Sequence, residues 1–462
     1  MKDISHNRPA EPYIPGSVAV IGSGIAGLSA AWLLAKRYDV TLYEAGACTG
    51  GHANTVVADT PRGPIPVDTG FIVYNRQNYP NLTALFRHLG VRAQDTTMSF
   101  SVSMNNGRFE YSGSGLGGLL AQRSNALKPG FWRMVRDLLR FYREAPALMI
   151  DDPTGNMSLG DYLIRGGFGR AFIADHLLPM AAAIWSAPTT EMLDFPATSF
   201  IRFFANHGLL QVRDRPRWQS LPGGSREYID ALLADARIRV RCNRTVRRVI
   251  RDASGVTVVD AHGRDMRFDN VVIASHADAA LAMLDHPSAD ERRLLGAFRY
   301  QKNRAVLHSD PSLMPRRKRA WAAWNYRGTG RDDDVSVTYW MNALQHIDQH
   351  APLFVSLNPD QEPDSRSIHF ETTYDHPVFD TAAMAAQREL WRLQGTQRTW
   401  FAGAHFGYGF HEDGIQSGLA VAEALGNVRR PWQVADESGR ITLGPGGLMR
   451  APAVSTMSEA AE

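Results

Sequence analysis

Short apolar runs near the N-terminus predict alternating strands and helices. Residues 18–21 form a continuous apolar run, which is typical of a buried strand. A turn of sequence GSGIAG at 22–27 separates this run from an apolar helical stretch at 28–35. A second short strand is predicted at 40–43. The order of strand, turn, helix and strand predicts an α/β domain built on a central parallel sheet.

The turn at 22–27 has the glycine spacing of a dinucleotide-binding site. Gly22 permits the tight turn, Gly24 lets the backbone approach a pyrophosphate, and Gly27 lets the helix pack closely on the strand. The helix N-terminus offers backbone N–H groups to the phosphates. Glu44 ends the second strand, 22 residues after Gly22, where a carboxylate can accept hydrogen bonds from ribose hydroxyls.

Further segments carry glycines where the chain could pass close to a cofactor. Gly50 and Gly51 follow the second strand, and a short strand with a turn is predicted at 67–70. A strand at 399–401 ends in a tight turn and leads to a helix whose N-terminus is expected to point back at the cofactor. Short strands separated by turns are also predicted at 238–240, 246–249, 255–259 and 268–274.

In this order, the motifs resemble those of the FAD-dependent amine oxidase and phytoene desaturase superfamily. The resemblance covers roughly residues 16–426 and implies a Rossmann-like domain that binds FAD without a covalent link. The residues that it places around FAD are Gly22, Gly24, Ile25, Ala26, Gly27, Glu44, Ala45, Gly50, Gly51, His52, Asp68, Thr69, Gly70, Val246, Gly403, Gly414, Ile415 and Gln416.

The resemblance also implies a division into domains. The FAD-binding domain would be discontinuous, consisting of 16–75, 215–285 and 390–426. The intervening segments, 76–214 and 286–389, would form a mixed α+β substrate domain. Residues 427–462 are polar and rich in Gly, Pro and Ser, which predicts a loose C-terminal tail.

Segments outside the cofactor motifs are similar to one bacterial subfamily, whose relatives accompany cyclopropane-fatty-acyl synthase-type methyltransferases. These segments are 71–75, 183–186, 206–210, 324–326 and 339–342. The similarity implies desaturation of a methylated acyl chain of a phospholipid, on the route to furan fatty acids. The side chains expected to line the substrate site are Tyr74, Trp185, Tyr326, Trp340, Asn342 and Phe410. The aromatic ones would equally fill an ordinary hydrophobic core.

Desaturation releases a proton that needs an acceptor within hydrogen-bond reach. The C-terminal motif offers His411, Glu412 and His405 as candidates, in that order of preference. Each has a structural alternative, since Glu412 could bond backbone N–H groups at the helix start and His411 could position the loop. His405 stands where many relatives carry an acidic residue, which leaves its contact with the cofactor open.

Composition narrows the classes of function. The chain has 462 residues, of which 44% are hydrophobic, so it can bury a large core in two or three domains. A net charge of +3 is too small to indicate nucleic-acid binding. Cys48 and Cys242 form neither a disulfide framework nor a metal-binding spacing. Because no signal segment or long apolar run is visible, we expect a cytoplasmic protein without a metal or a transmembrane helix.

Basic and aromatic residues gather in two places. A helix predicted at 131–143 brings Arg133, Arg136, Arg140 and Arg143 to one side, and a cluster at 316–319 precedes Trp321. Both suit an anionic membrane surface, although a solvated helix face and a solvated loop are the alternatives. We therefore expect a peripheral position at the inner membrane, with phospholipid as substrate and a fatty-acyl methyltransferase as a candidate partner.

Three other functions are compatible with the residues. An amine oxidase of this superfamily usually has a lysine bridged by water to the flavin, and Lys302 lies near a predicted strand of the substrate domain. A double-bond isomerase would show no net uptake of electrons. A flavin-bearing partner of a methyltransferase would have no chemistry of its own.

Overall fold

The chain divides into two compact units. The computed structural model describes residues 16–152, 157–185, 192–212, 215–328 and 336–445. Unit 1 consists of Met1–Gly51, Ile229–Ala297 and Ala386–Glu462. Unit 2 consists of His52–Tyr228 and Phe298–Ala385.

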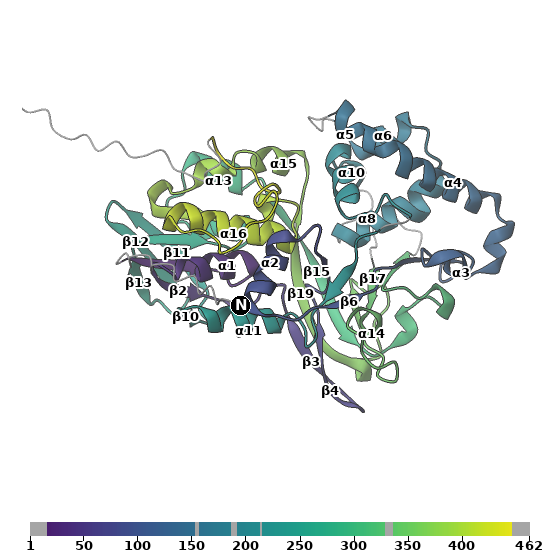
Figure 1. The fold of residues 1–462 in the computed structure, drawn as a ribbon, viewed down its shortest axis with the longest axis horizontal. Coiled ribbons are helices and arrows are strands. Elements are labelled where there is room, and N and C mark those ends of the chain that lie inside the picture. Colours follow the sequence, from purple (N-terminus) through teal and green to yellow (C-terminus); the bar gives the residue numbers. More distant parts are fainter. Residues whose placement is uncertain (1–15, 153–156, 186–191, 213–214, 329–335, 446–462) are drawn as a thin grey trace, which may run out of the picture. The chain divides into compact units, whose positions relative to one another are not determined.

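Unit 1 is built on a five-stranded parallel sheet, which confirms the α/β prediction (Figure 1). Its strand order is β10 (Ile238–Arg241), β2 (Asp39–Tyr43), β1 (Ser17–Ile21), β14 (Asn270–Ile273) and β20 (Thr399–Phe401). All four neighbouring pairs are parallel. Because the central strand β1 is covered on both faces, its apolar residues are continuous rather than alternating.

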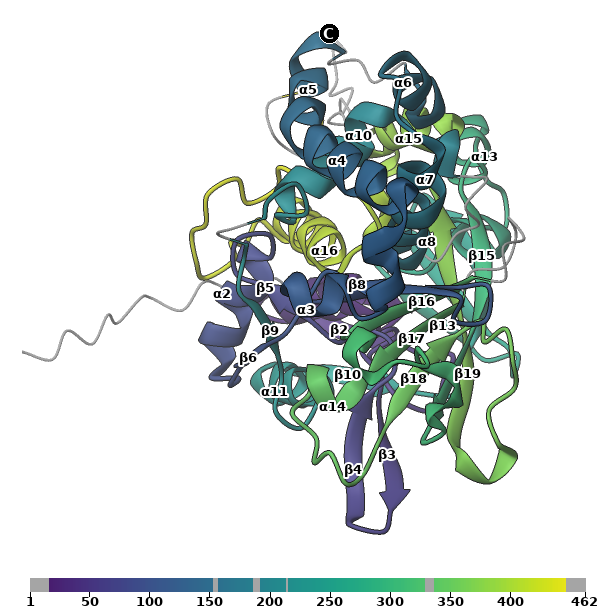
Figure 2. The same cartoon turned by 90° about the vertical axis from the view of Figure 1, so that its right-hand side faces the viewer.

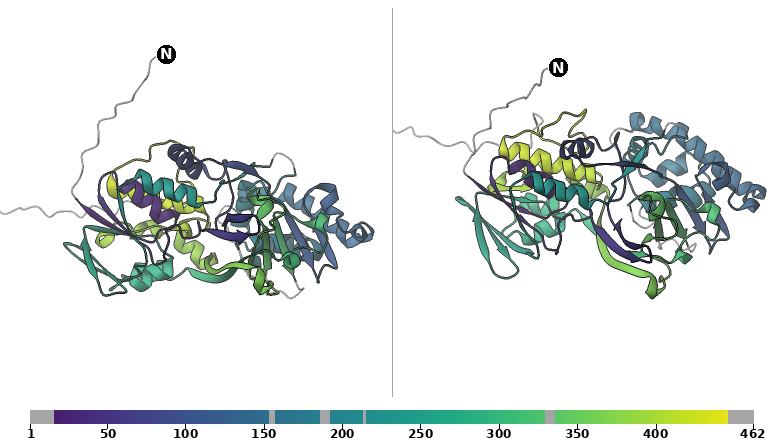
Figure 3. Two further views of the ribbon diagram at one scale, coloured as in Figure 1. Left: turned by 90° about the horizontal axis from the view of Figure 1, so that it is seen from below. Right: turned by 60° about the horizontal axis from the view of Figure 1, so that its bottom comes forward.

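Two helices pack together against this sheet. Every residue of α1 (Ile25–Leu34) is buried, as its uniformly apolar sequence requires. Helix α16 (His411–Gly426) lies directly against α1, seen as yellow on purple in both views of Figure 3. The other helices of unit 1 are α12 (Ala277–Met283) and α13 (Ala289–Leu295), while α11 (Arg226–Asp235) spans the boundary between the units.

A three-stranded antiparallel meander completes unit 1. Its strands are β11 (Val246–Asp252), β12 (Gly255–Asp260) and β13 (Asp265–Phe268). The single strand predicted at 268–274 is in fact two strands that meet at Asp269. The Asp269 N–H donates to the carbonyl of Ser17 at 3.1 Å, where the chain leaves the meander and enters the parallel sheet.

Unit 2 contains a seven-stranded mixed sheet and two small ones. The large sheet has the order β19 (Ile368–Val378), β15 (Arg299–His308), β18 (Phe354–Leu357), β17 (Ser336–Trp340), β16 (Trp324–Gly328), β7 (Phe100–Met104) and β8 (Phe109–Ser112). Only β16 and β7 pair in parallel among these described strands. The small sheets are the hairpin β3 (Thr55–Thr60) with β4 (Gly63–Asp68), and β5 (Tyr74–Asn75), β9 (Trp218–Ser220) and β6 (Gln94–Thr96).

Helices gather at one end of unit 2, at the top of Figure 2. They are α4 (Pro129–Glu144), α5 (Leu148–Asp151), α6 (Leu159–Arg165), α7 (Arg170–Phe172), α8 (Leu178–Trp185) and α10 (Ala197–Asn206). Phe141, Phe172 and Phe200 are fully buried between them. The remaining helices of the unit are α2 (Pro80–Leu89), α3 (Gly115–Leu119) and α14 (Met341–Leu344), and α15 (Thr381–Gln387) crosses into unit 1. No helix in the described ranges is long and apolar enough to cross a membrane.

Residues 286–297 and 386–389, predicted to lie in the substrate domain, group with unit 1. The units also differ from the predicted domains at 52–75 and 215–228. These two segments group with unit 2 because they bond to each other. Strand β5 pairs with β9, and Asp68 accepts a hydrogen bond from the Ser225 hydroxyl at 2.7 Å. The assignment of the segments to a cofactor domain and a substrate domain stays a prediction.

The predicted loose tail is wrong for residues 427–445, which pack on unit 1. The buried guanidinium of Arg430 bonds to Glu423 at 2.8 Å, and Trp432 stacks on Trp32 with ring centroids 5.7 Å apart. Arg440 forms an ion pair with the buried Asp413 at 2.8 Å. Polar composition misled the prediction because the arginines of this segment pair with acidic groups of α16. The rest of the tail, 446–462, lies outside the described residues.

Candidate cofactor site

The β1–α1 turn has the geometry that a dinucleotide site requires. Gly22 has a φ of +99°, and a Cβ there would lie 2.6 Å from the carbonyl oxygen of Ala274. A Cβ on Gly27 would lie 1.9 Å from the carbonyl oxygen of Gly22, so helix and strand touch at this glycine. A Cβ on Gly24 would meet no protein atom within 4 Å. Open space therefore lies at the one glycine that the motif places beside the pyrophosphate.

Backbone donors face this open space. In the described part of the chain, no backbone acceptor takes the N–H groups of Gly24, Ile25 and Ala26, whereas the N–H of Leu28 already bonds to the carbonyl of Gly24. These unpaired donors and the positive end of the helix dipole are suited to an anion. The residues present therefore fit the pyrophosphate of a dinucleotide.

Glu44 is fixed at the edge of the turn. Its carboxylate accepts hydrogen bonds from the Gly46 N–H at 2.7 Å and from both the N–H and the hydroxyl of Ser23. The loop before β11 also contacts Glu44, because the N–H of Arg244 donates to the Glu44 carbonyl at 2.8 Å. Val246 begins β11 two residues later and is buried, while Ala45 is exposed.

The glycine pair lies against the β1–α1 turn, as the motif order predicted. The Gly50 N–H donates to the Ser23 carbonyl at 3.0 Å, and a Cβ on Gly51 would lie 3.1 Å from the Cα of Gly24. Both glycines have a positive φ, +129° and +59°. The structure thus brings together two motifs that are separated in the sequence.

The C-terminal motif reaches the same turn through α16. A Cβ on Gly414 would lie 2.7 Å from the side chain of Ile25, and one on Gly418 would lie 2.2 Å from the carbonyl oxygen of Ala26. The Ser417 hydroxyl accepts from the Gly403 N–H at 3.0 Å, and its proton can go to the carbonyl of Gly414 at 2.8 Å or of Gly403 at 3.1 Å. Ile415 and Gln416 follow Gly414 and are buried.

Sequence reasoning missed residues that hold the 403–407 turn. Gln387 donates to the carbonyls of His405 at 2.9 Å and Gly407 at 2.6 Å, and Gln394 bonds both backbone groups of Phe401. No local pattern marks either glutamine, since each acts on a strand or turn formed later in the chain. Ser417 could have been singled out, because a serine between two glycines at a helix start favours contact with backbone groups.

The three candidate proton acceptors lie close together in sequence, and burial differs among them. Burial lowers the pKa of His405 to about 3, and that of His411 also to about 3, so both imidazoles are neutral at physiological pH. Glu412 is fully buried and accepts from the Gln416 amide at 3.1 Å. His411, at the first position of α16, is only partly buried. Their catalytic roles stay predictions.

Four residues predicted to contact the cofactor belong to unit 2. His52 lies beside Tyr374, with ring centroids 4.8 Å apart, and a Cβ on Gly70 would lie 2.3 Å from the His52 carbonyl oxygen. The Thr69 hydroxyl bonds to the Tyr374 hydroxyl at 2.7 Å. The Asp68 carboxylate accepts from Ser225 and from the Thr55 hydroxyl at 2.6 Å. Asp68 therefore joins β3, β4 and the 221–225 turn.

Replacing Asp68 by asparagine is expected to change how stability depends on pH. Burial outweighs three hydrogen bonds and raises the Asp68 pKa to about 6, above the unfolded value of about 3.9. The folded state therefore binds more protons between these values, and the contribution of Asp68 to stability falls by roughly 2 kcal/mol as pH rises from 4 to 7. Urea midpoints measured across this range should fall less steeply for Asp68→Asn. Parallel slopes for the two proteins would contradict this assignment.

The predicted substrate-lining residues are distributed over both units. In unit 2, Tyr74 packs on Phe86, Trp185 packs on Phe203 at 4.7 Å, and Trp340 packs on Trp321, while Tyr326 is buried in β16. The Asn342 amide bonds to the backbone of 348, 351 and 353, so it holds a loop. Phe410, in unit 1, directly precedes α16, and its N–H donates to the Asp413 carboxylate at 2.7 Å. A role in substrate contact stays a prediction for all six residues.

Unit 1 is thus an α/β dinucleotide-binding unit in which glycine motifs from both ends of the chain surround one helix N-terminus. A family model described as "Flavin containing amine oxidoreductase" matches residues 25–309. The chain belongs to this family, which confirms the predicted flavin cofactor, and it is a flavin-dependent oxidoreductase.

Known relatives carry different activities in their names. A putative flavin-containing monoamine oxidase, AofH of Mycobacterium tuberculosis, is 24% identical over 348 residues, which covers 72% of this chain and 71% of that protein. A hydroxyneurosporene desaturase of Rubrivivax gelatinosus is 27% identical over 342 residues, which covers 64% and 61%. Both a desaturase and an amine oxidase are therefore among the relatives of this chain.

Solved structures share the fold. A putative protoporphyrinogen oxidase from Exiguobacterium sp. 255-15 matches with a TM-score of 0.64 and 14% identity, covering 90% of this chain and all (100%) of that one. A CLA-producing fatty acid isomerase from P. acnes matches with a TM-score of 0.59 and 16% identity, covering 87% and 97%. At this identity the likeness concerns the fold alone.

Proposed function

We propose that this flavoprotein dehydrogenates a methylated unsaturated acyl chain of a membrane phospholipid. The bound flavin supplies the acceptor for the hydride that leaves the acyl chain. The protein supplies a position for the chain, exclusion of water and an acceptor for the proton. Similarity to a desaturase, and the subfamily segments around 71–75 and 339–342, support this choice.

The observation that carries the proposal is the placement of Lys302. In the β15–β19 ribbon Lys302 lies opposite Asp375, and the next residue, Asn303, lies opposite Tyr374. Neighbouring residues of a strand point to opposite faces, so Lys302 and Tyr374 are on different faces. His52, the residue next to the glycine pair, lies beside Tyr374. Lys302 therefore points away from His52, which argues against the lysine that amine oxidation would use.

The other described lysines support the same choice. Lys36, Lys128 and Lys318 are exposed, as is Lys302. Lys36 and Lys318 lie over the rings of Trp32 and Trp321. No lysine in the described part of the chain is buried. Amine oxidation by this protein would therefore need polar groups other than a buried lysine.

His411 is our first candidate for the proton acceptor. Burial of its imidazole lowers the pKa, which keeps the ring neutral over the range in which enzymes are assayed, and His411 stands at the first position of α16. Because a neutral histidine can accept a proton at any pH above its own pKa, the rate of flavin reduction should be flat from pH 5 to 8.

Anaerobic mixing of the purified flavoprotein with defined substrates tests the proposal. Phospholipid vesicles with methylated unsaturated acyl chains should bleach the flavin band and yield a new diene, while polyamines should not. His411→Gln should slow bleaching by about 100-fold, and His350→Gln, at an exposed histidine, should not. Bleaching by an amine alone would overturn the proposal in favour of amine oxidation. Lipid conversion without bleaching would overturn it in favour of isomerisation.

We also propose partners for this reaction. An anionic membrane surface would present the acyl chain, with the protein on the cytoplasmic side. A fatty-acyl methyltransferase would supply the methylated chain, since the methyl branch must be in place before this dehydrogenation. Copurification of the two enzymes from cells that express both would test the second partner.

A further inference from the structure

Two segments of unit 2 form a surface that we call the cationic platform. It consists of 108–136, which includes α3, the short helix η1 (Arg123–Leu127) and the start of α4, and of 316–319. The segments touch, because α3 and β8 both pack on the short helix η5 (Lys318–Ala320), and α4 packs on η1. The platform is therefore continuous although its two parts are far apart in sequence.

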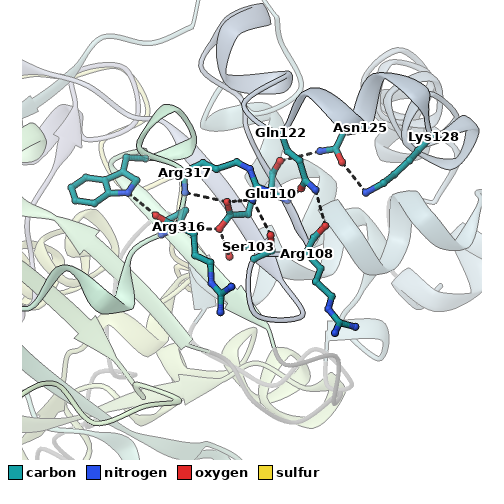
Figure 4. A network of polar contacts seen from close by, with 11 residues as sticks. Ser103, Arg108, Glu110, Gln122, Asn125, Lys128, Arg316 and Arg317 are labelled. Atoms are coloured by element: carbon teal, nitrogen blue, oxygen red, sulfur yellow. Dashed lines mark hydrogen bonds and ion pairs between the residues drawn. The ribbon is translucent and has the colours of Figure 1, made fainter.

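Glu110 holds the platform together from beneath. Its buried carboxylate accepts from the Arg317 guanidinium and from the Arg316 N–H, both at 2.8 Å (Figure 4). Its backbone N–H bonds to Gln122 at 2.9 Å and its carbonyl bonds to Asn125 at 3.0 Å. One residue of β8 thus ties η1 to the basic loop, while the guanidinium groups of Arg316 and Arg108 point away from it in Figure 4.

Burial removes every carboxylate of these segments from the surface. Between residues 96 and 143 the chain has only Glu110 and Asp137 as acids, and 316–327 has none. Asp137 is buried and accepts from the Gly169 N–H at 3.0 Å. Both acidic side chains are therefore buried inside unit 2, and the exposed charges of the platform are cationic. They are Arg108, Arg123, Lys128, Arg133, Arg136, Arg316, Lys318 and Arg319.

Arg140 is an exception to the basic stripe predicted on α4. Its guanidinium donates to the carbonyls of Gly166 at 2.9 Å and Gly167 at 3.1 Å, and lies 4.0 Å from the centre of the Phe168 ring. Arg140 therefore fixes the loop after α6. Arg143, the last arginine of the stripe, pairs with Glu144 at 2.7 Å. Arg136 lies 3.4 Å from the buried Asp137, and Arg133 is the arginine of the stripe for which the described residues show no ion pair.

Large apolar side chains project from the same platform. Leu116 is 78% exposed, Leu127 86% and Trp132 45%. The Trp132 indole N–H donates to the carbonyl of Ala126 at 2.9 Å, which holds the ring beside η1. Exposed leucines next to arginines and a tryptophan are typical of proteins that rest in the headgroup region of a bilayer.

We propose that the cationic platform docks the protein on an anionic lipid bilayer, with Leu116, Leu127 and Trp132 entering the headgroup boundary. This inference rests on the proposed function for the identity of its partner. Arginines and lysines near such a surface each add to binding through the negative surface potential, and inserted leucines add a contribution that salt does not screen. A nucleic acid would use the cations but would leave the leucines in water.

Sedimentation with vesicles tests the docking without any turnover. The protein should bind vesicles of phosphatidylglycerol and phosphatidylcholine at about 0.15 M salt, and pure phosphatidylcholine much more weakly. Arg133→Glu with Arg316→Glu should weaken binding by about 30-fold, because two cations become anions. Leu116→Ser with Leu127→Ser should weaken it by about 10-fold and leave the salt dependence unchanged.

Matched variants outside the platform serve as controls. Arg92→Glu with Arg247→Glu makes the same change of net charge at two exposed arginines, and Val57→Ser removes an apolar side chain that is 58% exposed. Equal loss of binding in controls and platform variants would overturn the proposal, as would binding to nucleic acid but not to vesicles. Vesicle binding without flavin bleaching would sustain the docking and refute the proposed reaction, so the two failures are distinguishable.

Discussion

Gly24→Asp is expected to yield a folded but colourless protein. The backbone of Gly24 is extended, with φ −65° and ψ 175°, and a Cβ there would touch no protein atom within 4 Å. Aspartate is among the best N-cap residues, so the flavin-free protein should keep or slightly gain stability. The carboxylate would occupy the space that the motif gives to the pyrophosphate. Repulsion between like charges should weaken flavin binding by at least about 100-fold.

The ratio of flavin to protein absorbance and the melting temperature of the flavin-free protein together test this expectation. Gly130→Asp is the control, because Gly130 also lies in the first turn of a helix and has open space at its Cβ. The control should retain its flavin. A yellow Gly24→Asp protein would show that the phosphates lie elsewhere, and a misfolded one would show that the space at Gly24 is not open.

Gly418→Ala is expected to destabilise the protein by about 3 kcal/mol or more, and to weaken flavin binding with it. The added Cβ would lie 2.2 Å from the carbonyl oxygen of Ala26 and 2.4 Å from the hydroxyl of Ser29. Neither helix can yield easily, because all residues of α1 are buried. Alanine improves helix propensity by about 1 kcal/mol, so the steric cost of the added methyl group should exceed the gain in propensity.

Urea unfolding and flavin content would measure this loss. Gly130→Ala, in an open helical position, should be neutral or stabilising by comparison. The effect of Gly414→Ala should be smaller than that of Gly418→Ala, because its nearest neighbour is the movable Ile25 side chain, at 2.7 Å. Unchanged stability in Gly418→Ala would mean that α16 is free to shift on α1.

The sequence predicted those parts of the fold that depend on residues close together in the chain. The apolar run at 18–21, the glycines at 22–27 and Glu44 all act within one βαβ unit, and the structure places them as expected. The glycine motifs near 50 and 403 could be predicted from resemblance, because such motifs are tied to one cofactor. Their meeting at α1 depends on long-range packing that no single motif contains.

Several residues have partners that are distant in the sequence and that no motif shows. The carboxylate of Asp68 accepts from Thr55 and Ser225, and its predicted contact with the cofactor stays a prediction. Glu110, which no sequence motif marks, is buried and accepts from the Arg317 guanidinium at 2.8 Å. Arg430 belongs to a polar stretch that reads as unstructured, and Glu423 makes it a packing residue. Composition describes the residues of a stretch but not the partners that they find.

The contact of α16 with α1 sets an order of events during synthesis of the protein. The glycine turn lies at 22–27, but the helix that packs on α1 ends at Gly426. A nascent chain therefore exposes apolar residues of α1 until α16 has been synthesised. Flavin binding therefore requires a chain that extends through α16, so a protein cut before His411 should not retain flavin.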